Sequence, residues 1–286
     1  MQMTIEDIVL DRDRRGISAL RPHLPADFCG QAASLVLEHP GTAMIVTGFY
    51  ILAAGATETD GPPGAIVIGD ALQSIGYEVV YVTDQHTAPL MTAVVGSRAR
   101  VVDFPIVDED ASKGFSAELL SQVDPSVLIA IERCGLDQEG LHRNMNGQDI
   151  SRYTALVDYL FSDHPNTVGI GDGGNEIGMG NLASIIPTVP SLVKAPCVIT
   201  TTRLVISSVS NWGGYGLVAA LSMQTGRDLL PAVDAEQELV KRIVDLGAVD
   251  GMSTRPEYRV DGFSLEENSQ TVERLHRFLA EQRTSS

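Results

Sequence analysis

Short apolar segments rich in β-branched residues alternate with helix-compatible segments along this chain of 286 residues. Such alternation indicates β–α–β units and therefore an α/β fold, Rossmann-like, with a mostly parallel sheet and helices on both faces. The expected strands are 43–49, 77–84, 99–105, 126–133, 166–172 and 197–203. The expected helices are 27–38, 63–75, 115–122, 149–162, 213–224, 234–246 and 265–282. Because neither a repeat nor a low-complexity linker interrupts the pattern, we expect one domain over residues 1–286.

The charge of the chain limits its partners. With 37 acidic and 20 basic side chains the net charge is -17, which repels nucleic-acid phosphates and anionic lipids. No segment approaches the roughly 18 apolar residues of a membrane span, and residues 1–16 lack a signal-peptide core. The three cysteines form no C-x-x-C pair, which suits a reducing compartment. We expect a cytoplasmic protein that binds a small molecule, as a monomer or a homo-oligomer.

Polar and glycine-rich segments follow several of the expected strands. They are 47–65, 83–86, 131–135 and 171–181, and a further one, 208–216, precedes a helix. In open α/β sheets ligands bind beyond the carboxyl ends of the strands, where these loops and the helix N-termini meet. We therefore expect the functional site at this edge of the sheet.

The segment 171–181, "GDGGNEIGMGN", is the most unusual of these loops, with five glycines in eleven residues. Glycine lets the backbone take a positive φ and approach a ligand closely. Asp172, Asn175 and Glu176 add oxygen atoms suited to a hard divalent cation or to a substrate ammonium group. The alternative is a structural turn, because Asp and Asn also stabilise turns through bonds to their own backbone.

Two other loops have alternative interpretations. In "TETDGPPGA" Pro62 and Pro63 suit the first turn of a helix, and Asp60 is placed to cap it, while the free N–H groups of that turn could also hold an anion. The segment 178–183, "GMGNLA", satisfies a loose form of the dinucleotide-binding pattern. A nucleotide-binding α/β protein is therefore one alternative function.

Four segments together resemble the D-glutamate cyclase-like family, once catalogued as a domain of unknown function. They are "TGFYILAAGATETDGPPGA", "IERCG" with the later "NMNGQDIS", "GDGGNEIGMGN" and "SNWGGYGLVAALS", and the resemblance runs from about residue 27 to the end. It implies a hydro-lyase of D-amino acid metabolism: the amine of D-glutamate attacks its own γ-carboxyl group, giving 5-oxo-D-proline and water. A cyclase or lyase acting on a different amino acid is the second alternative.

Under this resemblance, carboxylates at strand ends supply acid–base catalysis and arginines hold the substrate carboxylates. The expected catalytic residues are Glu132, Asp172, Glu176 and Asp60. The expected substrate-binding residues are Thr59, Gly61, Arg133, Asn144, Gly173, Asn175, Arg203 and Asn211. The two arginines have an alternative role as ion-pair partners of the many acids. Asp172 and Glu176 are also predicted to hold Mg²⁺ or Mn²⁺ as a Lewis acid, without an organic cofactor.

Overall fold

Six parallel strands form the central sheet in the computed structural model, which describes residues 3–285. The strands are β1 Thr42–Thr47, β4 Glu78–Thr83, β5 Arg100–Asp103, β6 Val127–Ile131, β7 Thr167–Gly171 and β8 Arg203–Ile206. Their spatial order is β5-β4-β1-β6-β7-β8. Counted along the chain this is 3-2-1-4-5-6, the doubly wound Rossmann order, in which the direction of winding reverses between β1 and β6. The predicted α/β fold is confirmed.

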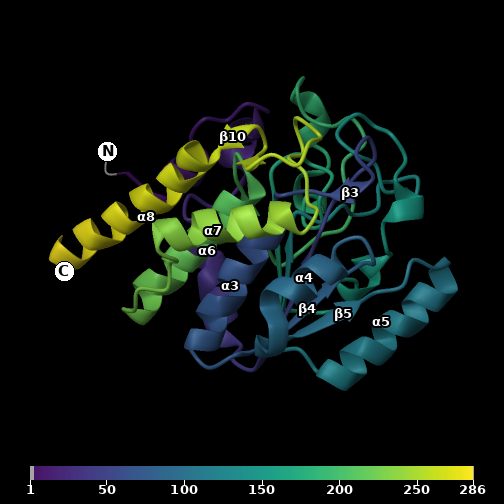
Figure 1. Cartoon of the computed structure of the whole chain (residues 1–286), viewed down its shortest axis with the longest axis horizontal. Helices are drawn as coiled ribbons and strands as arrows, with labels where there is room; N and C mark the ends of the chain where they lie inside the picture. The colour runs from purple at the N-terminus through teal and green to yellow at the C-terminus, as the bar shows by residue number, and fades with distance from the viewer. Residues whose placement is uncertain (1–2, 286) are drawn as a thin grey trace.

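Helices cover both faces of the sheet, but unequally (Figure 1). One face carries the helices α2 Phe28–Glu38, α3 Pro62–Ser74, α4 Ala88–Val95 and α6 Ser210–Thr225, with α1 Ile5–Val9, α7 Val233–Asp245 and α8 Leu265–Ser285 packed around them. The other face carries α5 Glu109–Val123 and irregular segments with short 3₁₀ turns. Along β1, Ala43 and Ile45 face the first layer and Met44 and Val46 the second. This alternation buries both faces of each strand, as in other parallel sheets.

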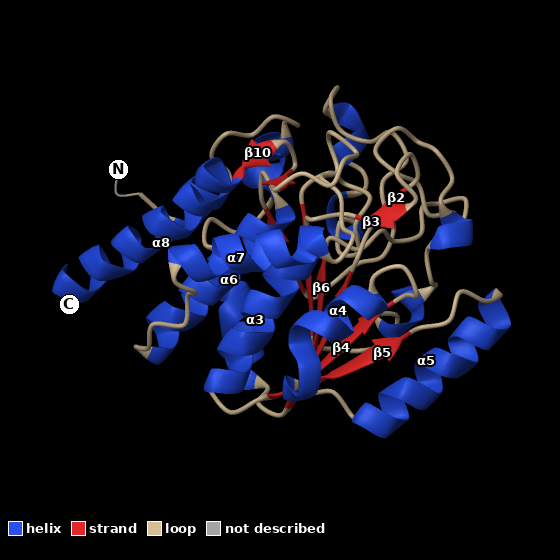
Figure 2. Ribbon diagram, viewed as in Figure 1, coloured by secondary structure: helices blue, strands red, loops and turns tan. Residues whose placement is uncertain are grey.

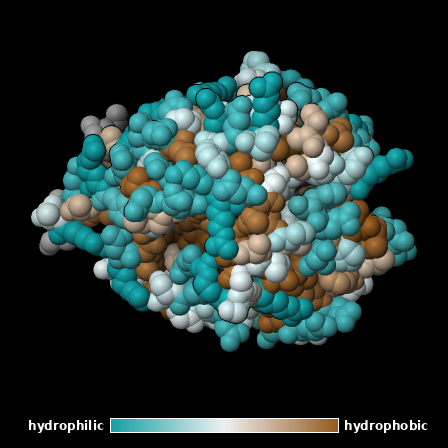
Figure 3. Space-filling model, in the orientation of Figure 1, coloured by the Kyte–Doolittle hydropathy of each residue, from teal (hydrophilic) through white to brown (hydrophobic). Residues whose placement is uncertain are grey.

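Shorter elements lie in the loops. Two small hairpins pair β2 Tyr50–Ile51 with β3 Ala56–Thr57, and β9 Arg259–Val260 with β10 Phe263–Ser264. The 3₁₀ turns are Ile17–His23, Gly96–Arg98, Ser151–Tyr153, Val157–Leu160, Gly180–Leu182 and Ile186–Thr188. Figure 2 shows that long loops crowd one end of the sheet. The surface in Figure 3 is mostly hydrophilic on this face, and hydrophobic residues show mainly in hollows. Among residues 3–285, none of the helices combines the length and the apolar character that a membrane crossing requires.

The predicted helix 149–162 is wrong. Two 3₁₀ turns stand there, Ser151–Tyr153 and Val157–Leu160. The carbonyl of Ala155 accepts an N–H from Arg133, and the carboxylate of Asp158 accepts the N–H of Leu136. Tertiary hydrogen bonds thus hold this segment against the sheet in place of an α-helical ladder. The helices α1 and α4 were not expected from the sequence. The predicted helix 115–122 is found but begins six residues earlier, as α5 Glu109–Val123, and the remaining predicted helices lie within about three residues of their expected bounds.

The predicted strand 197–203 is also wrong, because β8 begins only at Arg203. The residues before it bond to the glycine-rich loop: the N–H of Cys197 donates to the carbonyl of Gly174, and the carbonyl of Ile199 accepts the N–H of Gly178. This shift places Arg203 at the amino end of β8, where it pairs in register with Val168. The carboxyl end of β8 instead leads into α6.

Candidate active site

A cavity of about 480 Å³ opens beyond the carboxyl ends of β1, β6 and β7. It lies at the point where the strand order reverses, where Rossmann-like sheets bind their ligands. Its walls come from three further parts of the chain: the apolar segment 49–53, the segment 251–254 and the loop 144–148, called here the tip. Its charged lining residues are Arg15, Glu58, Glu132, Asp172 and Asp261.

Glu132 follows β6 directly and is held in an uncommon backbone conformation. Its φ is +43°, a left-handed value that costs a residue with a side chain about 1 kcal/mol or more. The backbone at Gly61 lies so close that a Cβ there would stand 2.8 Å from the Cβ of Glu132. The carboxylate accepts the hydroxyl of Ser210 at 2.5 Å. Burial, and then the charges of Glu176 and Asp60, hold the pKa of Glu132 well above its ordinary value.

Asp172 and Glu176 have different environments within the glycine-rich loop. The carboxylate of Glu176 turns back and accepts the N–H groups of Asp172, Gly173 and Gly174 at 3.2, 2.7 and 2.7 Å. Glu176 therefore stabilises the turn, a role that the structural alternative gave to Asp and Asn side chains. Asp172, in contrast, lines the cavity and forms an ion pair with Arg15. Burial raises the pKa of Asp172 well above its ordinary value, although Arg15 lowers it.

Asp60 and Asn211 cap each other's helices. The carboxylate of Asp60 accepts the N–H groups of Ser210 and Asn211 at 2.8 and 2.7 Å, at the start of α6. The side-chain oxygen of Asn211 accepts the N–H groups of Gly61 and Gly64 at 3.0 and 2.8 Å, at the start of α3. The prediction that Asp60 caps α3 is wrong, and the N–H groups expected to hold an anion there are already bonded. Burial, then the charge of Asp261, raises the pKa of Asp60 to about 7.

Neither predicted arginine reaches the cavity. Arg133 is buried and donates to the carboxylate of Asp84 at 2.7 Å and to the carbonyls of Gly48 and Ala155 at 3.0 and 2.9 Å. It is the partner of a buried acid, which was its alternative role. Arg203 lies at the opposite edge of the sheet, because β8 starts there, and it donates to the carbonyl of Thr202. The prediction that these two residues hold substrate carboxylates is contradicted by these positions.

Most of the remaining predicted binding residues face inward. Thr59, Gly61, Gly173 and Asn175 use their hydroxyl, backbone or amide N–H groups in hydrogen bonds within the protein. Asn144 lines the cavity. The structure thus brings Asn144 together with Glu132 and Asp172 around the cavity and places Asp60 and Glu176 beneath them.

Sequence reasoning missed Arg15, Asp261 and Glu58. Arg15 contacts Asp172 and, at 2.9 Å, Asp261, so one guanidinium group bridges two buried carboxylates. Arg15 belongs to "DRDRRG" near the N-terminus, and Asp261 to a "VDG" turn between β9 and β10. Neither segment follows a strand of the main sheet, so a search of strand ends passes over both. The charge-dense "DRDRRG" was the available signal.

The sequence profile of a protein family described as "D-glutamate cyclase-like, C-terminal" matches residues 5–276. The chain belongs to the D-glutamate cyclase-like family. From the sequence the resemblance to this family was expected to begin at about residue 27. The profile match begins earlier, at residue 5, and so includes Arg15. The human protein "D-glutamate cyclase, mitochondrial" is 32% identical over 233 residues, which covers 75% of this chain and 37% of the human protein. This chain therefore matches little more than a third of the length of that relative.

Within residues 3–285, the acids of this D-glutamate cyclase-like protein form two groups that could hold a cation, both containing Asp172. Oxygens of Glu132, Asp172 and Glu176 lie within 4.8 Å of one another, and so do those of Asp60, Asp172 and Asp261. Arg15 already lies between Asp172 and Asp261, which leaves the first group as the better fit for a metal. A carboxylate has about four acceptor positions, so Glu176 keeps capacity beyond its three backbone bonds.

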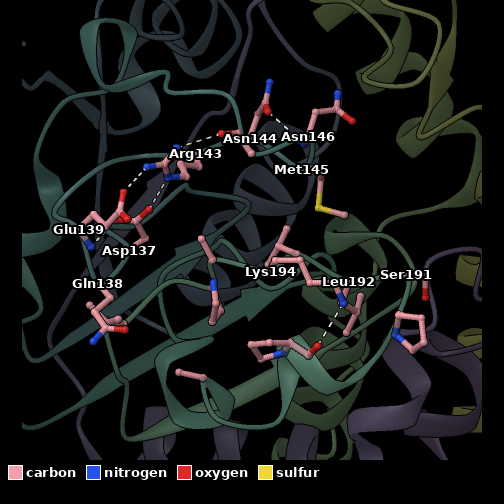
Figure 4. Close-up of a pocket in the computed structure, with 18 residues that line it drawn as sticks. Asp137, Gln138, Glu139, Arg143, Asn144, Met145, Asn146, Ser191, Leu192 and Lys194 are labelled. Carbon is pink, nitrogen blue, oxygen red and sulfur yellow. Dashed lines mark hydrogen bonds and ion pairs between the residues drawn. The ribbon is translucent and has the colours of Figure 1, made fainter.

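A larger cavity of about 1020 Å³ lies beside the acidic one (Figure 4). The two share the tip residues 144–146 and Ser191. In the larger cavity Arg143 is already paired with Asp137 and Glu139, and Met145 projects towards the segment of Ser191. The one buried acid of the described lining of the larger cavity, Asp137, is paired with Arg143, whereas Glu58, Glu132, Asp172 and Asp261 line only the smaller cavity. The smaller cavity is therefore the candidate active site of this family member.

Proposed function

We propose that this protein is a hydro-lyase that converts D-glutamate into 5-oxo-D-proline and water. The observation that carries the proposal is the cavity at the strand-order reversal, where buried carboxyl groups of raised pKa meet one arginine. Family membership and the name of the human relative support the same reaction. A zwitterionic dicarboxylic amino acid suits a cavity that offers both signs of charge.

The proposed reaction needs one base and one acid. Arg15 contacts Asp172 directly, which favours the carboxylate form, so we assign Asp172 as the base that accepts a proton from the substrate ammonium. Glu132 has no such contact and accepts the Ser210 hydroxyl, so we assign it as the acid.

The amine then attacks the γ-carbon, a C–N bond forms and a γ C–O bond breaks. The two protons that leave the ammonium group, together with one γ-oxygen, make up the water. Holding amine and γ-carbon together in a small cavity can lower the barrier by several kcal/mol.

The same environment also activates the group that is attacked. A cavity that raises the pKa of its own carboxyl groups also favours the protonated form of a substrate γ-carboxyl bound beside them. A neutral carboxyl is a better electrophile than a carboxylate. As an alternative to this protonation, we propose that Glu132, Asp172 and Glu176 would all be carboxylates holding Mg²⁺ or Mn²⁺, which would polarise the γ-carboxyl as a Lewis acid in place of a proton from Glu132.

The test is formation of 5-oxoproline by the purified protein from D-glutamate, compared with L-glutamate and with longer or substituted glutamates. Turnover of D-glutamate supports the proposal. Turnover of another amino acid with D-glutamate inert would favour the alternative substrate. Thermal stabilisation by NAD or ATP alone would favour the nucleotide-binding alternative.

The structural basis of that alternative is weak. The N–H groups of Gly178 and Gly180 donate to the carbonyl of Ile199, and a short 3₁₀ turn follows where a dinucleotide-binding loop requires a long helix. The cytoplasmic location and the oligomeric state stay predictions from the sequence.

A further inference from the structure

Arg15 is the one lysine or arginine among the described residues that line the acidic cavity. Four acids share that lining, Glu58, Glu132, Asp172 and Asp261. The product of the proposed reaction carries a single charge, its carboxylate, because the lactam ring is neutral. Bound among acids alone, that carboxylate would be repelled at every position. The cavity therefore needs a cation wherever a ligand carboxylate is to bind.

The guanidinium group of Arg15 is available for this role. Its side chain is 20% exposed, and its two ion pairs join separate nitrogens to Asp172 and Asp261. Arginine has five N–H donors, so two ion pairs leave donors for a third carboxylate.

Asp261 is itself an unusual residue at this site. Its side chain is 5% exposed, its φ is +51°, its Oδ1 lies 2.9 Å from the Arg15 guanidinium, and its Oδ2 has no hydrogen-bond donor among residues 3–285. A buried acceptor without a donor costs free energy, so the arrangement is expected to serve a ligand or to hold the arginine. Its ion pair with Arg15 joins the N-terminal segment to the β9–β10 turn beside the cavity.

We propose that Arg15 binds the α-carboxylate of the substrate, the group retained in the product, and that Asp261 is a positioning residue for its guanidinium. This inference rests on the proposed function for the identity of the ligand. The α-carboxylate takes no part in bond making, so Arg15 contributes to binding and orientation of the amino acid. The γ-carboxyl is then directed to Glu132 and Asp172.

The experiment compares two ligands that differ only in the carboxylate, 5-oxo-D-proline and 2-pyrrolidinone, by calorimetry. Wild type, Arg15→Gln, Arg15→Lys and Arg12→Gln are measured. Arg12 is exposed and contacts Gln270 outside the cavity, so its variant is the matched control. We expect Arg15→Gln to bind 5-oxo-D-proline at least about tenfold more weakly, while 2-pyrrolidinone and the control change little. Arg15→Lys should recover part of the loss, since it keeps the charge without the planar fork.

Kinetics provide a second measurement. Arg15→Gln should raise the KM for D-glutamate by more than it lowers kcat, because its contact is present before and after reaction. Asp261→Asn should raise KM by a smaller factor and leave the melting temperature near that of wild type. The inference is overturned if wild type and Arg15→Gln bind 5-oxo-D-proline with equal affinity. It is also overturned if wild type does not bind 5-oxo-D-proline.

Failure of the proposed function gives a different result. If wild type converts D-glutamate and Arg15→Gln has the same KM, the proposed function stands and the role of Arg15 is refuted. Wild type that does not convert D-glutamate refutes the function. Arg15 is then judged by thermal shift with a panel of amino acids: stabilisation of wild type that Arg15→Gln loses supports the carboxylate site, and equal or absent stabilisation refutes it.

Discussion

Glu236, a buried acid outside the cavity, provides the sharpest test of the electrostatics of this structure. It lies on α7 with no exposed surface, and its Oε1 accepts the hydroxyl of Tyr215 at 2.9 Å and the amide of Asn268 at 2.5 Å. Its Oε2 has no partner among the described residues. Burial raises the pKa of Glu236 from 4.5 to about 7, and the two hydrogen bonds oppose part of that rise. We predict that Glu236→Gln removes a large part of the pH dependence of stability.

The magnitude follows from this pKa change. A pKa raised from 4.5 to about 7 corresponds to about 3 kcal/mol of extra cost to ionise the group in the folded protein. Because the folded state binds the proton more tightly, the contribution of Glu236 to wild-type stability is greatest below pH 4.5, falls as the pH rises towards 7 and is constant above it. Glutamine cannot ionise and contributes no such loss. The side-chain NH₂ group of the glutamine, where Oε2 now lies, would be buried without an acceptor, which lowers the unfolding free energy by an amount that does not depend on pH.

The assay is urea unfolding of wild type and Glu236→Gln at several pH values between 4.5 and 8. Other buried carboxyls titrate equally in both proteins, so the difference in unfolding free energy isolates Glu236. That difference should move by about 3 kcal/mol in favour of the variant across this range. A difference independent of pH would show that Glu236 has the same pKa folded and unfolded and would refute the reasoning. Tyr215→Phe removes a hydrogen bond that lowers the pKa of Glu236, so in that variant the loss should be larger and should extend to higher pH than in wild type.

Three further substitutions and one treatment test the site. Asp172→Asn should lower kcat by about 10²–10⁴ with an unchanged melting temperature, and activity within a few fold of wild type would leave Asp172 only a structural role as the partner of Arg15. Asn211→Ala should lower the unfolding free energy by about 1–3 kcal/mol, because the buried N–H of Gly64 loses its acceptor while that of Gly61 keeps only Asp60; a loss well below 1 kcal/mol would show that water replaces the Asn211 oxygen. Gly173→Ala should raise KM several fold, because the new Cβ meets the Met145 sulfur, and adding Met145→Ala should restore the KM. Unchanged kinetics of Gly173→Ala would show that the tip 144–148 moves aside without affecting the cavity. Treatment with a chelator should slow 5-oxoproline formation and added Mg²⁺ or Mn²⁺ should restore it, whereas full activity of protein shown to be metal-free would remove the metal from the proposal.

The sequence alone was sufficient for the fold class and for the edge of the sheet where the site lies. Burial of a parallel strand on both faces requires a continuous run of apolar residues, and such a run is a local property that the sequence displays directly. Acids placed just after such runs, such as Glu132 and Asp172, must meet at one edge because the strands are parallel. The "GDGGNEIGMGN" loop could likewise be located, and its family identified, from its residues.

Only the tertiary structure decided which of these side chains face the ligand. Asp60 reaches across to cap α6, Arg133 pairs with Asp84, and Glu176 turns back onto its own loop. Arg15 and Asp261 come from segments 246 residues apart that precede and follow the sheet. The direction and partner of a polar side chain depend on groups that packing brings close from distant parts of the chain. Spacing along the chain carries no record of them, and burial, which raises the carboxyl pKa values here, is itself a product of that packing.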